Sequence, residues 1–139
     1  MKNSIDQKIA DYFQDKSDVV AVYLFGSYAH GKERPFSDID IGITFKPLRR
    51  DQYHKRVDGY LPDLARILRR DVHLVIMNTA AEKLLKQVFI KGKCLLVRDA
   101  RLLARLKMIM FSRIAEFGFY RPIMQKGMVA KIMNRGPNG

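Results

Sequence analysis

The sequence predicts an α/β (α+β) fold, in which a small mixed sheet of about four strands is flanked by α-helices. Short β-branched runs alternate with longer amphipathic stretches along the chain, as expected when helices cover a sheet. The 139 residues suit one domain with its own core, and 47% hydrophobic with 29% charged residues excludes a disordered or fibrous chain. We therefore expect a single domain over residues 1–135 and a disordered tail, GPNG, at 136–139.

The beginning of the chain predicts one helix and two strands. Apolar side chains recur at helical spacing over residues 4–16, with Asn3 or Ser4 available as the N-cap. The run VVAVYLF at 19–25 is typical of a strand buried on both faces. A loop rich in polar residues follows, and DIDIGITF at 38–45 predicts the second strand.

The rest of the chain predicts further alternation of helices and strands. Gly59 and Pro62 are expected to interrupt the second helical region, at 49–70, with Pro62 beginning a new segment. The expected elements are a helical region at 49–70, a strand at 71–77, a helix at 80–90, a strand at 94–97, a helix at 99–117 and a short helix before a frayed end.

The cellular compartment is expected to be the cytoplasm. No apolar run approaches the roughly 20 residues of a membrane span, and the start MKNSIDQK lacks a signal-peptide apolar region. The single cysteine, Cys94, lies in the apolar stretch CLLV, where a buried structural thiol is expected. These features argue against membrane, disulfide and cysteine-based zinc functions.

The charge is strongly basic and unevenly distributed. The formal net charge is +12, and residues 91–139 contain eleven basic and two acidic side chains. A segment of this kind either binds a polyanion or an acidic partner or forms a solvent-exposed basic helix face. The charge alone does not decide between these two interpretations.

The segment with the clearest chemistry is FGSYAHGKERPFSDIDIGI. Gly26 and Ser27 follow a strand, and ten residues later Asp38 and Asp40 open the next strand. Because strand side chains alternate, both carboxylates point to one face, where their repulsion requires a cation; magnesium with substrate phosphates fits best. Gly26 lets a phosphate approach the backbone, and Ser27 offers a hydroxyl and an N–H.

This Gly-Ser, ten residues, Asp-x-Asp pattern resembles the nucleotidyltransferase superfamily that includes polymerase beta. The resemblance implies a third carboxylate on a neighbouring strand, for which Asp71 has the residue type and position. It also implies that a nucleoside triphosphate binds with two magnesium ions and that a nucleoside monophosphate passes to a hydroxyl, releasing pyrophosphate. Asp38, Asp40 and Asp71 would be the catalytic metal ligands, and Gly26, Ser27 and Ser37 the nucleotide-binding residues.

The short chain resembles a minimal MNT-type nucleotidyltransferase over about residues 5–125, including the segment FGFYRPI at 117–123. The resemblance implies an antitoxin that uses ATP and magnesium to adenylylate a tyrosine hydroxyl of a HEPN ribonuclease toxin. Two alternatives stay open: a nucleotidyltransferase for antibiotics or other small molecules, and a non-catalytic module that neutralises a partner or grips RNA.

Other residues near the motif have two readings each. Ser37 either binds a phosphate or caps the loop, and Lys32 and Arg34 either meet the triphosphate or are ordinary basic loop residues. His73 alternates onto the same strand face as Asp71, but a partly exposed structural imidazole is the expected role.

Overall fold

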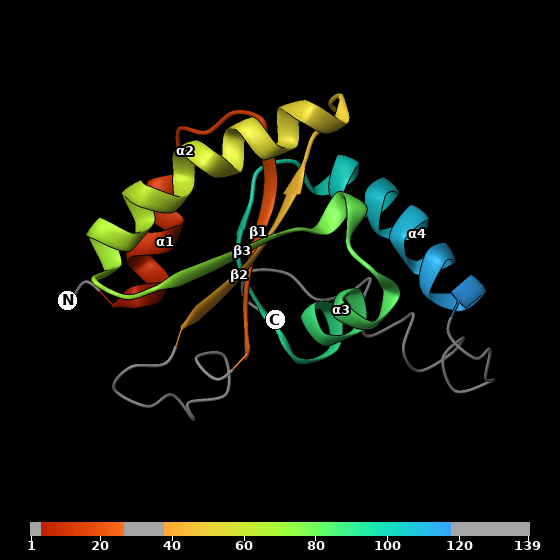
Figure 1. Ribbon diagram of the computed structural model, residues 1–139. Helices are drawn as coiled ribbons and strands as arrows, with labels where there is room; N and C mark the ends of the chain where they lie inside the picture. Colours follow the sequence, from red (N-terminus) through yellow and green to blue (C-terminus); the bar gives the residue numbers. More distant parts are fainter. Residues whose placement is uncertain (1–3, 27–37, 118–139) are drawn as a thin grey trace.

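The computed structural model describes residues 4–26 and 38–117, which form one sheet with helices on both faces (Figure 1). The elements in chain order are α1 (Ile5–Phe13), β1 (Val19–Phe25), β2 (Ile39–Phe45), α2 (Arg50–Leu68), β3 (Val72–Ile76), the 3-10 turn η2 (Met77–Thr79), α3 (Glu82–Lys86), the π-helical turn η3 (Gln87–Lys91), β4 (Lys93–Val97) and α4 (Ala100–Phe117).

The sheet is mixed and has the strand order β3-β2-β1-β4. β1 pairs antiparallel with β2 and with β4, whereas β2 and β3 run parallel. The predicted class, a mixed four-stranded sheet flanked by α-helices, is therefore confirmed.

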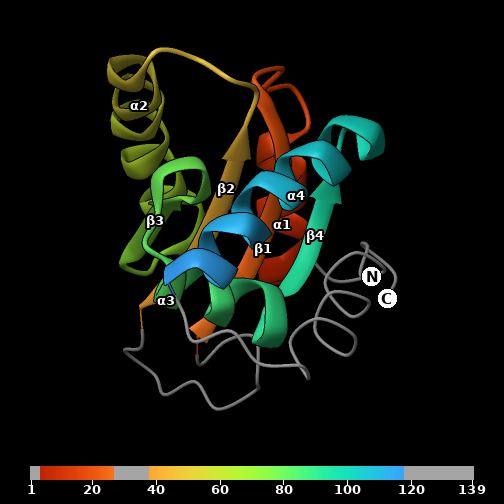
Figure 2. The same cartoon turned by 90° about the vertical axis from the view of Figure 1, so that its right-hand side faces the viewer.

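Each face of the sheet has its own hydrophobic core. α1 and α2 cover one face, where Ile39, Ile41 and Ile43 of β2 are fully buried. α3 and α4 cover the opposite face, on which Phe25 of β1 and Val75 of β3 lie (Figures 1 and 2). Because strand side chains alternate, Asp40 of β2 points to the face covered by α3 and α4.

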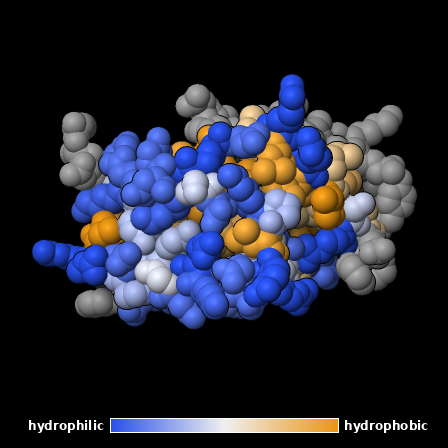
Figure 3. Space-filling view, turned by 90° about the horizontal axis from the view of Figure 1, so that it is seen from above, coloured by the Kyte–Doolittle hydropathy of each residue, from blue (hydrophilic) through white to orange (hydrophobic). Residues whose placement is uncertain are grey.

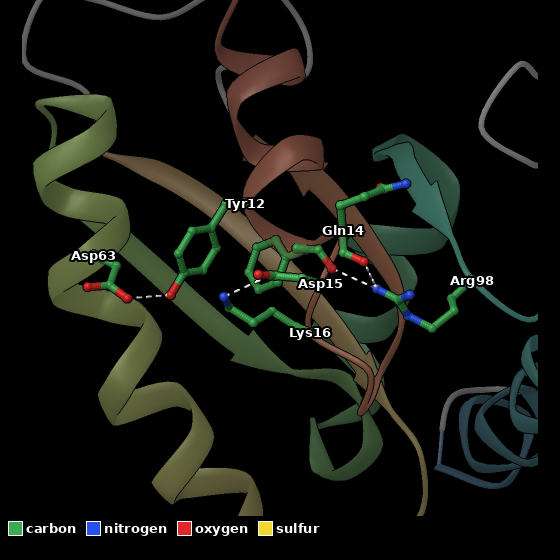
Figure 4. A network of polar contacts seen from close by, with 7 residues as sticks. Tyr12, Gln14, Asp15, Lys16, Asp63 and Arg98 are labelled. Atoms are coloured by element: carbon green, nitrogen blue, oxygen red, sulfur yellow. Dashed lines mark hydrogen bonds and ion pairs between the residues drawn. The ribbon is translucent and has the colours of Figure 1, made fainter.

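Polar contacts tie α1 to the elements around it (Figure 4). The Tyr12 hydroxyl donates to the Asp63 carboxylate of α2 over 2.6 Å. The Arg98 guanidinium, just after β4, donates to the backbone carbonyls of Phe13, Gln14 and Val19 over 2.7–2.9 Å. Arg98 thus joins the end of α1, the start of β1 and the end of β4, so this basic residue of the segment 91–139 has a structural role.

The predicted break in the second helical region is wrong. α2 is continuous from Arg50 to Leu68, with Pro62 inside it and Gly59 on its exposed side. Apolar side chains recur at helical spacing on both sides of Gly59 and Pro62, and they are buried against the sheet. This burial outweighs the local preference of proline and glycine for helix ends. The buried residues are Tyr53, Val57, Tyr60, Leu64 and Leu68.

Most other element boundaries lie within a few residues of the expected ones. Ser4 is the N-cap of α1, since its hydroxyl accepts from the Gln7 N–H over 3.1 Å. The helix expected at 80–90 is instead a short α3 followed by the π turn η3. The short C-terminal helix and the tail at 136–139 lie outside the described residues. None of the described helices has the combination of length and apolarity needed to cross a membrane.

Candidate active site

The turn after β1 brings a glycine against a carboxylate of β2. Gly26 has a backbone φ of +74°, a left-handed conformation that side chains other than hydrogen disfavour. Phe25 pairs with Asp40 across the antiparallel β1–β2 ladder. A Cβ built on Gly26 would overlap the Asp40 Oδ2 atom, so a side chain here would displace the Asp40 carboxylate, and the left-handed conformation independently favours glycine.

The two carboxylates of the Asp-x-Asp motif have different environments. Asp38 is exposed just before β2, whereas the Asp40 side chain is only 26% exposed. Burial raises the pKa of Asp40 above its usual range; the hydrogen bond and charge of His73 oppose this rise, and the negative charge of Asp38 adds to it. The pair is therefore electrostatically coupled, and a cation placed between the two carboxylates would relieve their repulsion.

His73, for which the sequence predicts a structural role, contacts Asp40. β2 and β3 are in parallel register with Asp40 opposite His73, and His73 Nδ1 lies 3.3 Å from Asp40 Oδ1. The His73 side chain is 66% exposed. Phe25, Asp40 and His73 thus occupy one level across three neighbouring strands. The alternation of β3 was the signal for this placement, but the register with β2 was needed to use it.

Asp71, the predicted third carboxylate, lies at the same edge of the sheet. It is exposed, it precedes β3, and its backbone carbonyl accepts from the Ile39 N–H over 2.9 Å. Together with Ala65, Arg69 and Arg70 it lines an open hollow of about 420 Å³. Its role as a metal ligand stays a prediction.

Magnesium fits the two carboxylates on β2. This ion takes one or two carboxylates and completes its coordination with water and substrate phosphates. Asp38 and Asp40 are such a pair, and the missing side chain of Gly26 allows the Asp40 carboxylate to lie against the turn after β1. Among residues 4–26 and 38–117, no three carboxylate, imidazole or thiol groups are already gathered around one point that could hold a metal.

The remaining predicted nucleotide contacts cannot be placed. Ser27 and Ser37, together with Lys32 and Arg34, lie outside the described residues. The residues that flank this segment, Gly26 and Asp38, stand at the edge of the sheet where Asp40 lies.

The surface of α4 differs from the site in character. Arg101 and Arg105 are exposed on this helix, and so are the apolar side chains Met108 and Ile109, which are 56% and 58% exposed. In Figure 3 apolar residues gather on the side of the molecule where α4 lies, within an otherwise hydrophilic face. The exposed surface of α4 is therefore basic in its first turns and apolar in the turn that follows them.

A mixed sheet whose first strand ends in a glycine turn, with Asp38 just before the next strand and Asp40 on it, is the arrangement expected of a nucleotidyltransferase. A family model described as polymerase beta, nucleotidyltransferase matches residues 7–101. The chain therefore belongs to the polymerase beta nucleotidyltransferase family. The sequence has no significant match among curated proteins.

Solved structures with this fold include several toxin–antitoxin complexes. A chain of a crystal structure of a toxin–antitoxin with AMP-PNP is 25% identical, has a TM-score of 0.64, and the match covers 92% of this chain and 98% of that one. A mutant of the toxin–antitoxin MntA–HpeT gives 25% identity and a TM-score of 0.64, covering 96% and 99% of the two chains. The fold also matches in a tri-AMPylated Shewanella oneidensis HEPN toxin in complex with MNT antitoxin, at 24% identity, a TM-score of 0.56, and coverage of 93% and 96%. The chain is thus similar to each of these neighbours over nearly the whole length of both chains.

Proposed function

We propose that this protein is the cytoplasmic antitoxin of a HEPN/MNT pair and that it transfers AMP from ATP to a tyrosine hydroxyl of its HEPN toxin. The observation that carries the proposal is the position of the Asp40 carboxylate, which lies against Gly26, with Asp38 two residues earlier in the sequence. This arrangement suits a triphosphate that enters along the backbone at Gly26 and meets cations held by the two carboxylates.

Each residue has a defined part in the proposed reaction. Asp38 and Asp40 hold divalent cations, Gly26 admits the phosphates, and Ser27 and Ser37 bind the phosphate oxygens. The third metal ligand comes from the start of β3, where sequence analysis names Asp71. Two magnesium ions held by these carboxylates would neutralise charge on the attacking and leaving oxygens. The acceptor oxygen forms a bond to the α-phosphorus, the bond to pyrophosphate breaks, and the hydroxyl proton is released.

A protein acceptor agrees with the exposed character of the site. The Asp38 carboxylate and the hollow at Asp71 are open to solvent, so an acceptor that brings its own surface can reach them. Docking would position the hydroxyl and raise its effective concentration at the α-phosphorus. The neighbours with a nucleotide analogue and with an AMPylated toxin support ATP as the donor and a HEPN toxin as the acceptor.

The test combines the purified protein with α-labelled ATP, magnesium and the product of the adjacent gene. We expect the label on a tyrosine of that partner, with a mass increase of whole AMP units, and no transfer by Asp38→Asn. Labelling of an aminoglycoside or of RNA, with the partner unmodified, would replace the proposal with the small-molecule or nucleic-acid alternative. A tight complex with no label anywhere, unaffected by Asp38→Asn, would identify a non-catalytic neutralising module.

A further inference from the structure

We infer that His73 is the third protein ligand of the cation held by Asp38 and Asp40, and that its nitrogen makes the site favour manganese over magnesium. This inference rests on the proposed metal-dependent transfer and specifies the cation of that same site. It replaces Asp71 in the ligand set.

The first argument is the separation between two donor atoms. His73 Nδ1 and Asp40 Oδ1 are 3.3 Å apart. An octahedral ion with bonds of about 2.1 Å separates neighbouring ligand atoms by about 3.0 Å. One cation can therefore bind both atoms after a shift of a few tenths of an ångström, which an exposed imidazole readily makes.

The second argument is the position of His73 on the sheet. The parallel register sets His73 directly opposite Asp40, and the alternation of strand side chains puts both on the face of α3 and α4. Phe25 stands at the same level on the other side of Asp40, and the next residue, Gly26, lies against the Asp40 carboxylate. A cation at Asp40 would thus lie between an imidazole on β3 and the glycine turn that follows β1.

Asp71 occupies a different level. Ile39 pairs with Val72, so continuation of the register sets Asp71 opposite Asp38, one step further from Asp40. The charges that act on the Asp40 carboxylate are those of His73 and Asp38, and Asp71 lines the hollow beside Arg69 and Arg70 instead. His73 is therefore better placed than Asp71 to share a cation with Asp40.

The identity of the donor atom sets the expected metal preference. Magnesium prefers oxygen ligands and water, whereas imidazole nitrogen binds first-row transition metals well. Manganese accepts carboxylates and keeps octahedral geometry, so it suits a set of two carboxylates and one imidazole. Replacing the imidazole by a carboxylate restores a magnesium-type set of ligands.

The experiment measures bound manganese without turnover. The protein, labelled with ¹⁵N-histidine, is loaded with Mn²⁺ and AMP-PNP, and pulsed electron paramagnetic resonance reads the coupling between manganese and histidine nitrogen. Free manganese is titrated in the same samples, with magnesium as competitor. The variants are His73→Asn, His73→Asp and Asp71→Asn, with His54→Asn as the matched control at an exposed histidine of α2. Thermal melts verify that each variant folds.

We expect histidine coupling in the wild type, in Asp71→Asn and in His54→Asn, and its loss in His73→Asn together with an about ten-fold or greater drop in manganese affinity. His73→Asp should recover binding and shift the preference toward magnesium. Manganese that binds without histidine coupling, absence of bound manganese, or a loss of affinity in Asp71→Asn but not in His73→Asn would each overturn the inference. Coupling without modification of any partner would contradict the proposed acceptor alone, and partner modification without coupling would contradict the role of His73 alone.

Discussion

The Asp40 carboxylate occupies the space that a side chain on Gly26 would need. This contact couples the turn after β1 to the motif on β2, so that the backbone conformation and the carboxylate position depend on each other. The geometry of the proposed nucleotide site at Gly26 and Asp40 therefore depends on the pairing of β1 with β2.

Gly26→Ala should therefore damage both stability and transfer. The left-handed φ of +74° and the overlap with Asp40 lead us to expect a loss of about 1–3 kcal/mol in the free energy of unfolding, with transfer reduced more than ten-fold, about 1.4 kcal/mol or more of transition-state stabilisation. Denaturant titration and the labelled-ATP assay measure the two effects.

Gly59→Ala is the matched control. Gly59 lies within α2, and a Cβ there would have no atom within 4 Å. Because alanine favours helix over glycine, this variant should gain about 0.5–1 kcal/mol and keep full activity. Equal stability of the two variants would contradict the importance of the Gly26–Asp40 contact.

Asp40→Asn should raise stability at neutral pH while it abolishes transfer. Folding raises the pKa of Asp40, mainly by burial, so ionisation of this carboxylate opposes folding. The protonated Asp40 carboxyl therefore favours folding. This contribution to the free energy of unfolding is complete below pH 3.8, the ordinary pKa, and is lost as the pH rises through the raised pKa of the folded state.

Unfolding measured from pH 3 to pH 7 tests this linkage for wild type and Asp40→Asn. The two curves should converge toward the acid end, below about pH 4, and the variant should be the more stable at pH 7. A variant that is less stable at pH 7 would show that the His73 contact outweighs the cost of burial.

The parts of the site that were predictable are those encoded by local spacing. The run VVAVYLF and the alternation of DIDIGI place Gly26, Asp38 and Asp40 on neighbouring strands, and the structure agrees. The contact of His73 with Asp40 was not predictable in this way, because it depends on the register between β2 and β3, and those strands are separated by the whole of α2.

The helix α2 shows the opposite failure of local rules. Gly59 and Pro62 are ordinary signals for a helix end, yet the helix continues past both. The stripe that runs from Tyr53 to Leu68 packs on the sheet, and this tertiary contact decides the outcome. Such packing is not visible in the residues around the proline.

Arg98→Ala should lower the free energy of unfolding by about 2–3 kcal/mol. The guanidinium donates hydrogen bonds to three backbone carbonyls, and its removal leaves these acceptors without this donor. Arg101→Ala, at an exposed position three residues later, should change stability by about 0.5 kcal/mol or less. Chemical denaturation measures both. A similar loss in the two variants would mean that net charge, rather than the carbonyl contacts of Arg98, controls stability.

The arginines exposed on α4 should control the rate at which the protein meets an acidic partner. Arg101 and Arg105 lie one turn apart on the helix, and long-range attraction to an acidic surface raises the association rate. The double variant Arg101→Ala, Arg105→Ala should therefore slow association with the proposed toxin partner several-fold in low salt, with dissociation nearly unchanged. The difference should fade toward about 0.5 M salt, where the screening length falls to about 4 Å. Stopped-flow or surface-based kinetics over a salt series measures this.

The control is the double variant Arg50→Ala, Lys55→Ala on α2, which removes the same charge from the helix on the opposite face of the sheet. An equal slowing of association by this control would show that net charge, not the surface of α4, directs the encounter.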